Sequence, residues 1–163
     1  MAEMGDQHQQ IVNFTVGGVN YGVPVDQVRE VRDMQSVTPV PGAPSYVKGV
    51  TNLRGQIITV IDLRKRLELA DNGKGGEKII VIEMDNLAVG VVVDSVTEVS
   101  TIAGKNIEKE ATTMIDSRYV LGIGKEGDRL VVILDLRKVI TGIEDKLPGQ
   151  ESSSVKKVAV TKS

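Results

Sequence analysis

The sequence predicts a mainly β protein made of two small lobes that are related by internal duplication. The first observation is a repeated segment, since residues 22–31 (GVPVDQVREV) return as residues 90–99 (GVVVDSVTEV) with seven of ten positions identical. The second is the composition: hydrophobic residues make up 40% of the 163 residues, whereas aromatic residues make up only 2%. A core of Val, Ile and Leu favours strands. A repeat of this length indicates two copies of one structural unit.

A second pair of matching segments supports the duplication. Residues 46–50 (YVKGV) precede the sequence DLRK at 62–65, and residues 119–123 (YVLGI) precede the same four letters at 135–138. The offset is 68 residues for the first match and 73 for this one, so the later copy carries five extra residues between its two signatures.

The repeat sets the expected lobe boundaries at about 11–70 for lobe one and about 78–143 for lobe two. A lobe of about 60 residues would be only marginally stable alone, so we expect the two lobes to pack side by side. The last residues, 148–163, are rich in Ser and Lys and show no periodic pattern, which predicts a mobile polar tail.

Each copy opens with a predicted β-hairpin. In the first copy the strands are expected at 11–16 and 21–25 around a turn at 17–20. The second copy repeats the pattern with strands at 79–84 and 87–93 and a turn at 85–86.

The segments after the hairpins predict short helical connections and one extended connection. Val25, Val28 and Val31 lie three apart, as do their counterparts in the second copy, and this spacing favours a short helical turn. Residues 38–44 contain three prolines and therefore predict an extended surface connection. The longer segment 101–117 replaces it in the second copy and has room for a helical turn.

Two apolar runs, 56–61 and 130–134, predict strands that are buried on both faces. Ile58 in the first run is expected to be in the core. Asp62 and Asp135 close the runs, and acids that recur with a repeat are expected to be strand-end or cap residues rather than a catalytic pair.

The composition argues against several classes of function. The chain has no Cys, which excludes disulfides and a thiol nucleophile, and its only histidine is His8, so no catalytic triad or metal cluster is expected. The net charge of −2 and the low content of aromatic residues, 2% of the chain, disfavour nucleic-acid binding. No apolar run is long enough to cross a bilayer, and we expect no cofactor.

The segment 46–64 (YVKGVTNLRGQIITVIDLR) resembles the central signature of the CheW family of chemotaxis coupling proteins. The resemblance extends outward over roughly residues 11–143. It implies a CheW-like domain at 1–147 made of two open, five-stranded, SH3-like β-barrels. Whether the first strand stays in its own lobe or is exchanged into the other is left open by the sequence.

The resemblance also implies a function. Members of the family are non-enzymatic adaptors that couple the cytoplasmic tips of chemoreceptors to the regulatory domain of the histidine kinase CheA. The protein is accordingly expected in the cytoplasm beneath receptor arrays, monomeric alone and ring-forming in arrays. The alternatives are a CheW-like domain from a larger signalling protein, either CheA or CheV, and a small β-barrel that binds nucleic acid.

Motif positions of the family suggest the contact residues. Glu30 and Arg54 are expected to form an ion pair that shapes the receptor-facing surface, although Arg54 has no match in the second copy. The other receptor-facing candidates are valines, for which core packing is an equal alternative: Val28, Val96 and Val99. The kinase-facing candidates are Gly49, Ile79 and Ile80, and Gly49 is equally explained by a backbone requirement.

Overall fold

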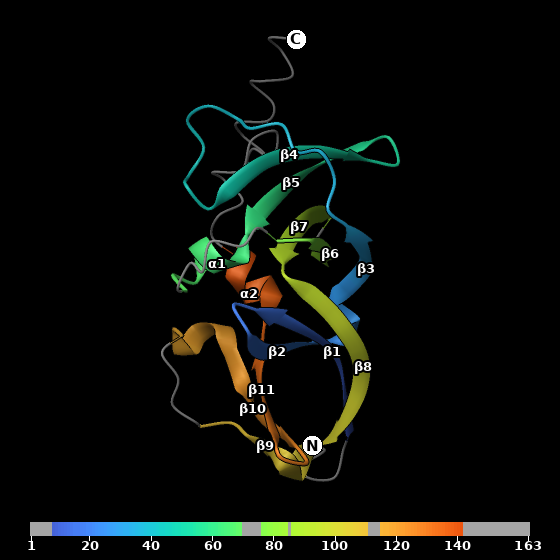
Figure 1. Cartoon of the computed structure of the whole chain (residues 1–163), viewed down its shortest axis with the longest axis vertical. Helices are drawn as coiled ribbons and strands as arrows, with labels where there is room; N and C mark the ends of the chain where they lie inside the picture. The colour runs from blue at the N-terminus through green and yellow to red at the C-terminus, as the bar shows by residue number, and fades with distance from the viewer. Residues whose placement is uncertain (1–7, 70–75, 85, 111–114, 142–163) are drawn as a thin grey trace.

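The structure, a computed structural model, describes residues 8–69, 76–84, 86–110 and 115–141. The predicted tail at 148–163 lies outside these residues. The described residues form two β-lobes stacked along the long axis of the molecule (Figure 1). We call the lobe at the top of Figure 1 lobe one and the lobe at the bottom lobe two. The prediction of a mainly β fold with two lobes is confirmed.

Lobe one is a five-stranded sheet with the strand order β3-β6-β7-β5-β4. These strands are β3 (Val28–Asp33), β4 (Val47–Leu53), β5 (Gln56–Asp62), β6 (Lys78–Met84) and β7 (Leu87–Val93). Lobe two is a six-stranded sheet with the order β8-β1-β2-β11-β10-β9. Its strands are β1 (His8–Val16), β2 (Val19–Pro24), β8 (Ser95–Ala103), β9 (Ile107–Glu108), β10 (Val120–Glu126) and β11 (Arg129–Leu134). The sixth strand, β9, comes from the longer connection of the second copy.

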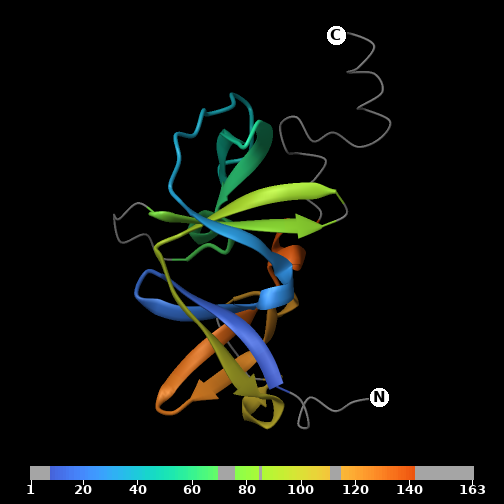
Figure 2. The same cartoon turned by 90° about the vertical axis from the view of Figure 1, so that its right-hand side faces the viewer.

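The two copies exchange their opening hairpins. Hairpin β1–β2 belongs to the first copy but pairs with β8 and β11 in lobe two, whereas hairpin β6–β7 belongs to the second copy but pairs with β3 and β5 in lobe one. Figure 2 shows the blue hairpin β1–β2 in the lower lobe and the yellow-green strands β6 and β7 in the upper one. The contiguous ranges 11–70 and 78–143 therefore describe the sequence copies, and each lobe combines strands from both.

The predicted helical turn forms in the first copy only. A 3₁₀ turn at Val25–Gln27 connects β2 to β3. In the second copy β7 and β8 are separated by a bend at Asp94 alone, so the prediction is wrong there. The backbone N–H of Asp94 donates to the carbonyl of Thr15, and the chain continues directly as strand β8 paired with β1.

The connection between the lobes at Gln27 is fixed by buried hydrogen bonds. The Gln27 side chain is buried; its Nε2 donates to Oδ1 of Asp135 at 3.0 Å, and its Oε1 accepts from the backbone N–H of Leu136 at 2.9 Å. A side chain from the first copy therefore binds the start of a helix of the second copy.

One short helix follows the last strand of each copy: α1 (Leu63–Arg66) in the first and α2 (Leu136–Ile140) in the second. Asp62 accepts the backbone N–H of Arg64 at 2.9 Å, and Asp135 accepts that of Lys138 at 3.2 Å, as N-cap residues do. The interpretation of these recurring acids as caps is confirmed.

The core consists of three clusters of buried side chains. The largest draws on both sheets and includes Phe14, Val23, Ile80 and Leu134, so it lies between the lobes. A second cluster around Ile58 comes from strands of lobe one, and a third comes from strands of lobe two. Because burying an aliphatic side chain contributes about 1.5–3 kcal/mol, the shared cluster makes each lobe depend on the other.

The prediction of two buried faces holds for only part of each apolar run. Ile58 is 1% exposed, as expected, but Ile57 and Leu130 are 55% and 58% exposed. These two residues lie at matching positions near the tips of their hairpins, beyond the reach of the opposite lobe. Strand β7 is buried at every position.

Candidate functional site

Strands β3 and β8 are matching elements of the two copies and lie on the same side of the molecule (Figures 1 and 2). The receptor-facing candidates come from these strands and from the tip of hairpin β4–β5. Each of the two strands is the outermost strand of its sheet, so each offers a flank to solvent.

The expected ion pair between Glu30 and Arg54 is present. Nη1 of Arg54 lies 3.1 Å from Oε2 of Glu30, and Nη2 lies 3.1 Å from Oε1, which is the two-pronged geometry that a guanidinium forms with a carboxylate. Arg32 also approaches Glu30 Oε1, at 3.5 Å. Because β3 and β4 are the two outer strands of one sheet, this contact shows that the sheet curls into an open barrel.

The backbone at Arg54 is held in an unfavourable conformation. Arg54 and Gly55 have φ angles of +55° and +83° and form the two-residue turn between Leu53 and Gln56. The Asn52 side chain accepts the backbone N–H of Gly55 at 2.8 Å and fixes this turn. A positive φ costs a residue other than glycine about 1 kcal/mol, so the strained turn places the arginine where it can reach β3.

Lobe two contains a counterpart of this pair that the sequence comparison missed. Nη2 of Arg129 lies 3.0 Å from Oε2 of Glu98 and 2.6 Å from Oε1 of Glu126. Glu98 matches Glu30 in the repeat, but Arg129 stands two positions beyond the residue that matches Arg54. The signal that could have revealed this pair is the recurring glutamate. Its partner is the nearest arginine of the next hairpin, not the residue at the aligned position.

The three candidate valines lie in different environments. Val28 and Val96 are half-buried and pack against the cluster between the lobes. Val99 is 58% exposed on β8 and is available to a partner. Its match in the first copy, Val31, is 40% exposed on β3 and was not among the candidates.

The kinase-facing candidates are positioned mainly by packing. The side chains of Ile79 and Ile80 are buried in the lobe-one cluster and in the cluster between the lobes, so neither is available for direct contact in this structure. Gly49 has a φ of +146°, and a Cβ there would lie 2.0 Å from the carbonyl oxygen of Thr38. A backbone requirement therefore explains this glycine.

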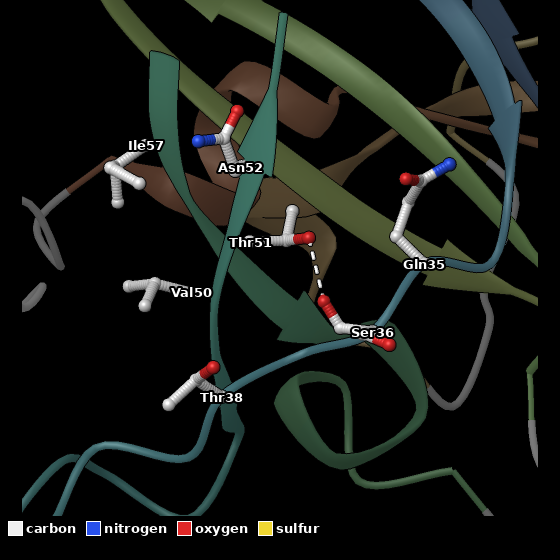
Figure 3. A pocket seen from close by; sticks show the side chains of 7 residues that line it. All are labelled: Gln35, Ser36, Thr38, Val50, Thr51, Asn52 and Ile57. Carbon is white, nitrogen blue, oxygen red and sulfur yellow. Dashed lines mark hydrogen bonds between the residues drawn. The ribbon is translucent and has the colours of Figure 1, made fainter. Parts of the chain in front are cut away.

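A pocket of about 400 Å³ lies along the outer edge of β4. It is lined by Gln35, Ser36, Thr38, Val50, Thr51, Asn52 and Ile57. Figure 3 shows Val50 and Ile57 on one side of β4 and Gln35 and Ser36 on the other, with the hydroxyl of Thr51 donating to the carbonyl of Ser36 at 2.7 Å. The pocket thus combines an apolar wall with a polar wall beside an outer strand.

Charged groups elsewhere form local pairs. Hydrogen bonds from the Arg118 side chain and backbone lower the pKa of Asp116 to about 2, and the ammonium of Lys78 lowers the pKa of Asp33. Within the described parts of the chain, no group of three or more His, Cys, Asp or Glu residues is arranged to hold a metal ion. None of the helices among the same residues has the length and apolarity needed to span a membrane.

The fold and these surfaces define a protein-interaction scaffold made of two β-lobes. A family model described as a CheW-like domain matches residues 10–144. The chain is 33% identical over 141 residues to chemotaxis protein CheW of Klebsiella aerogenes, which covers 83% of this chain and 84% of that protein. It is 34% identical over 140 residues to chemotaxis protein CheW of Bacillus subtilis, which covers 81% of this chain and 86% of that protein.

A solved structure gives the same result. The crystal structure of the scaffolding protein TtCheW from Thermoanaerobacter tengcongensis superposes with a TM-score of 0.76 at 36% sequence identity, covering 83% of this chain and 94% of that one. The chain belongs to the CheW family of chemotaxis proteins.

Proposed function

We propose that this protein is a non-enzymatic adaptor that couples the cytoplasmic tips of chemoreceptors to the regulatory domain of the histidine kinase CheA. The observation that carries the proposal is membership of the CheW family over residues 10–144. The expected place of action is the cytoplasmic face of receptor arrays. There the protein, monomeric alone, joins rings through head-to-tail contacts, since contacts of that type can close into rings.

The receptor-facing surface consists of Glu30, Arg54, Val28, Val96 and Val99. Its support is the geometry of the ion pair: a partly buried carboxylate held by a strained, exposed arginine. The apolar part is the exposed Val99 together with the half-buried Val28 and Val96, which pack against the cluster between the lobes. A receptor hairpin tip is helical, and helices dock in grooves lined by short aliphatic side chains.

The kinase-facing surface lies along the edge of β4. Gly49 belongs to this strand, and its close approach to Thr38 shapes the edge next to the pocket. Ile79 and Ile80 contribute by holding the sheet in place from within the core, not by direct contact.

Titrations of the full chain with two separate fragments test both halves of the proposal. One fragment is a receptor hairpin tip and the other is the CheA regulatory domain. We expect saturable binding of each fragment, and a ternary complex when both are present. No binding of either fragment at concentrations of tens of micromolar would overturn the proposal, and exclusive binding of one would overturn the coupling role.

A further inference from the structure

Strand β4 has an unused section of hydrogen-bonding edge. The backbone N–H and C=O of Val50 both bond outward to Thr38, at 2.9 and 2.8 Å. Peptide groups alternate in direction along an antiparallel strand, so those of Asn52, two residues on, point to the same outer side. The two-residue turn at Arg54 and Gly55 supports the same orientation. It makes Leu53 and Gln56 the hydrogen-bonded pair of the hairpin, so the backbone groups of the preceding residue, Asn52, point away from β5.

Within the described part of the chain, nothing is hydrogen-bonded to the backbone N–H and C=O of Asn52, and the residue is exposed. The Asn52 side chain turns back to cap the hairpin at Gly55. The two backbone groups therefore face solvent between the Thr38 bridge and the hairpin tip.

Comparison with lobe two shows which part of this edge differs between the lobes. Lys125, which matches Asn52, is also exposed and lies beyond the β9 pairing at Ile123 and Gly124, so the difference is in the neighbouring connection. There β9 pairs with β10 over two residues, and a 3₁₀ turn at Gly104–Asn106 lies just before β9. The segment from Val96 to the bridging Glu108 is two residues longer than the matching segment from Val28 to Thr38. In lobe one the shorter connection bonds β4 at a single residue and leaves the pocket beside Asn52.

The pocket has the two walls that an added strand requires. Successive side chains of an extended segment point to opposite faces. One face of β4 carries Val50 and the exposed Ile57, and the other faces Gln35 and Ser36 (Figure 3). An incoming strand with one apolar side chain next to one polar, hydrogen-bonding side chain would match both walls.

We propose that an extended segment of the kinase regulatory domain adds to the edge of β4 as a further strand and exchanges backbone hydrogen bonds with Asn52. The proposal rests on the proposed function, which supplies the partner. The geometry supplies the mode of binding, because an exposed strand edge selects an extended backbone and not a helix. The added strand would extend the pairing that the chain's own Thr38 already makes with this edge at Val50.

Asn52→Pro tests the proposal, since proline removes the backbone N–H and is tolerated on outer strands. We expect it to weaken binding of the CheA regulatory domain by about tenfold relative to Asn52→Ala, the usual effect of losing one or two backbone hydrogen bonds, and to give the same receptor-fragment affinity as Asn52→Ala, which loses the same side-chain bond to Gly55. Asn52→Ala keeps the N–H and controls for the side chain. Lys125→Pro controls for proline, because Lys125 has the matching edge position on β10. Both controls should bind within about twofold of the unmodified protein.

Amide hydrogen exchange of the unmodified chain gives a second readout that does not depend on the variant folding. Binding of the kinase domain should slow exchange at Asn52 and leave Lys125 unchanged. Unprotected Asn52 in a saturated complex, or full affinity of a folded Asn52→Pro variant, would overturn strand addition while leaving the adaptor function intact. Failure of the unmodified chain to bind the kinase domain at all would overturn the adaptor function itself, and the inference with it.

Discussion

The two lobes share one plan of strands but differ at the tip of the long hairpin and at the edge beside it. In lobe one the recurring glutamate is held by Arg54 in a strained turn, and the neighbouring edge of β4 is open. In lobe two it is held by Arg129 on the strand itself, and β9 pairs with the edge. The ion pair of the recurring glutamate is shared by both lobes, whereas the strained arginine turn and the single-residue bridge to the outer edge belong to lobe one. Features that both lobes retain serve folding, and features that differ are the better candidates for docking.

The connections between the lobes show the same combination of symmetry and divergence. Arg64 of α1 donates both Nη2 hydrogen bonds to the Asp94 carboxylate, at 2.9 and 3.1 Å, and its match Arg137 of α2 donates to the backbone carbonyl of Asp26 at 3.0 Å. The connection at Asp94 therefore contains an ion pair, whereas the connection at Asp26 contains a hydrogen bond from a guanidinium to a neutral backbone carbonyl.

The largest expected effect comes from a charge in the lobe-one core. Ile58→Asp places a carboxylate at a site that is 1% exposed, which should cost at least about 4 kcal/mol and unfold the protein cooperatively, because the lobes share their hairpins. Circular dichroism melting measures the effect. Ile57→Asp is the matched control: the adjacent residue faces solvent, and its melting midpoint should change little. Equal midpoints for the two variants would contradict the assignment of faces on β5.

The next effect compares the two interlobe arginines. Arg64→Ala removes the hydrogen bonds from one guanidinium nitrogen to both oxygens of a carboxylate and should cost about 2–3 kcal/mol, whereas Arg137→Ala removes a bond to a neutral carbonyl and should cost about 1 kcal/mol. Urea titration of both variants gives the two free energies of unfolding. Equal losses would show that the lobes are connected symmetrically despite the difference in partners.

The sequence was sufficient for features encoded locally. Hairpins and the Asp62 and Asp135 caps each depend on residues close together in the chain. The connection at 38–44 is irregular, as three prolines require, but it is not extended throughout, because it turns at Pro41 and Gly42. The exchange of hairpins was not accessible, because both copies carry nearly the same strand patterns and either pairing buries the same side chains. Ile79 and Ile80 illustrate a further limit: adjacent strand residues face opposite sides, but both sides of β6 are covered, one by its own lobe and one by the other lobe.

The ion pair of the candidate site was predicted in lobe one, where both partners belong to the motif. Its counterpart in lobe two was missed, because one partner stands at a different position in the sequence. Glu30 and Arg54 were paired correctly. Arg129 was missed because it stands at the start of β11, two positions beyond the turn residue that aligns with Arg54, and it reaches the recurring glutamate from there. The open edge at Asn52 was also missed, since free backbone groups leave no mark on residue types.

A smaller change in stability is expected at the paired hairpin tips. Each of these ion pairs has one exposed member, Arg54 in the first and Glu98 in the second, so Arg54→Asp and Arg129→Asp should each cost less than about 1 kcal/mol. Their effects on function should differ. In mixtures of receptor, CheA and adaptor, Arg54→Asp should reduce kinase activation and Arg129→Asp should not. Equal activation by both variants would remove Arg54 from the receptor-facing surface.

The smallest effect concerns the 3₁₀ turn Ser117–Tyr119 of the second copy, which Asp116 begins; the matching residue of the first copy is Ala43. Hydrogen bonds from Arg118 lower the pKa of Asp116 from 3.8 to about 2. Since the folded pKa lies below the unfolded one, the ionised carboxylate stabilises the fold above about pH 4, and this contribution is lost as the pH falls toward 2. Asp116→Asn should therefore lower the melting temperature slightly at pH 7, and the difference from the unmodified protein should close between pH 4 and 2. Asp128→Asn, at an exposed turn position, controls for the change in net charge. A difference that persists unchanged at pH 2 would show that the amide disturbs the turn itself, and that the charge of Asp116 is not what stabilises it.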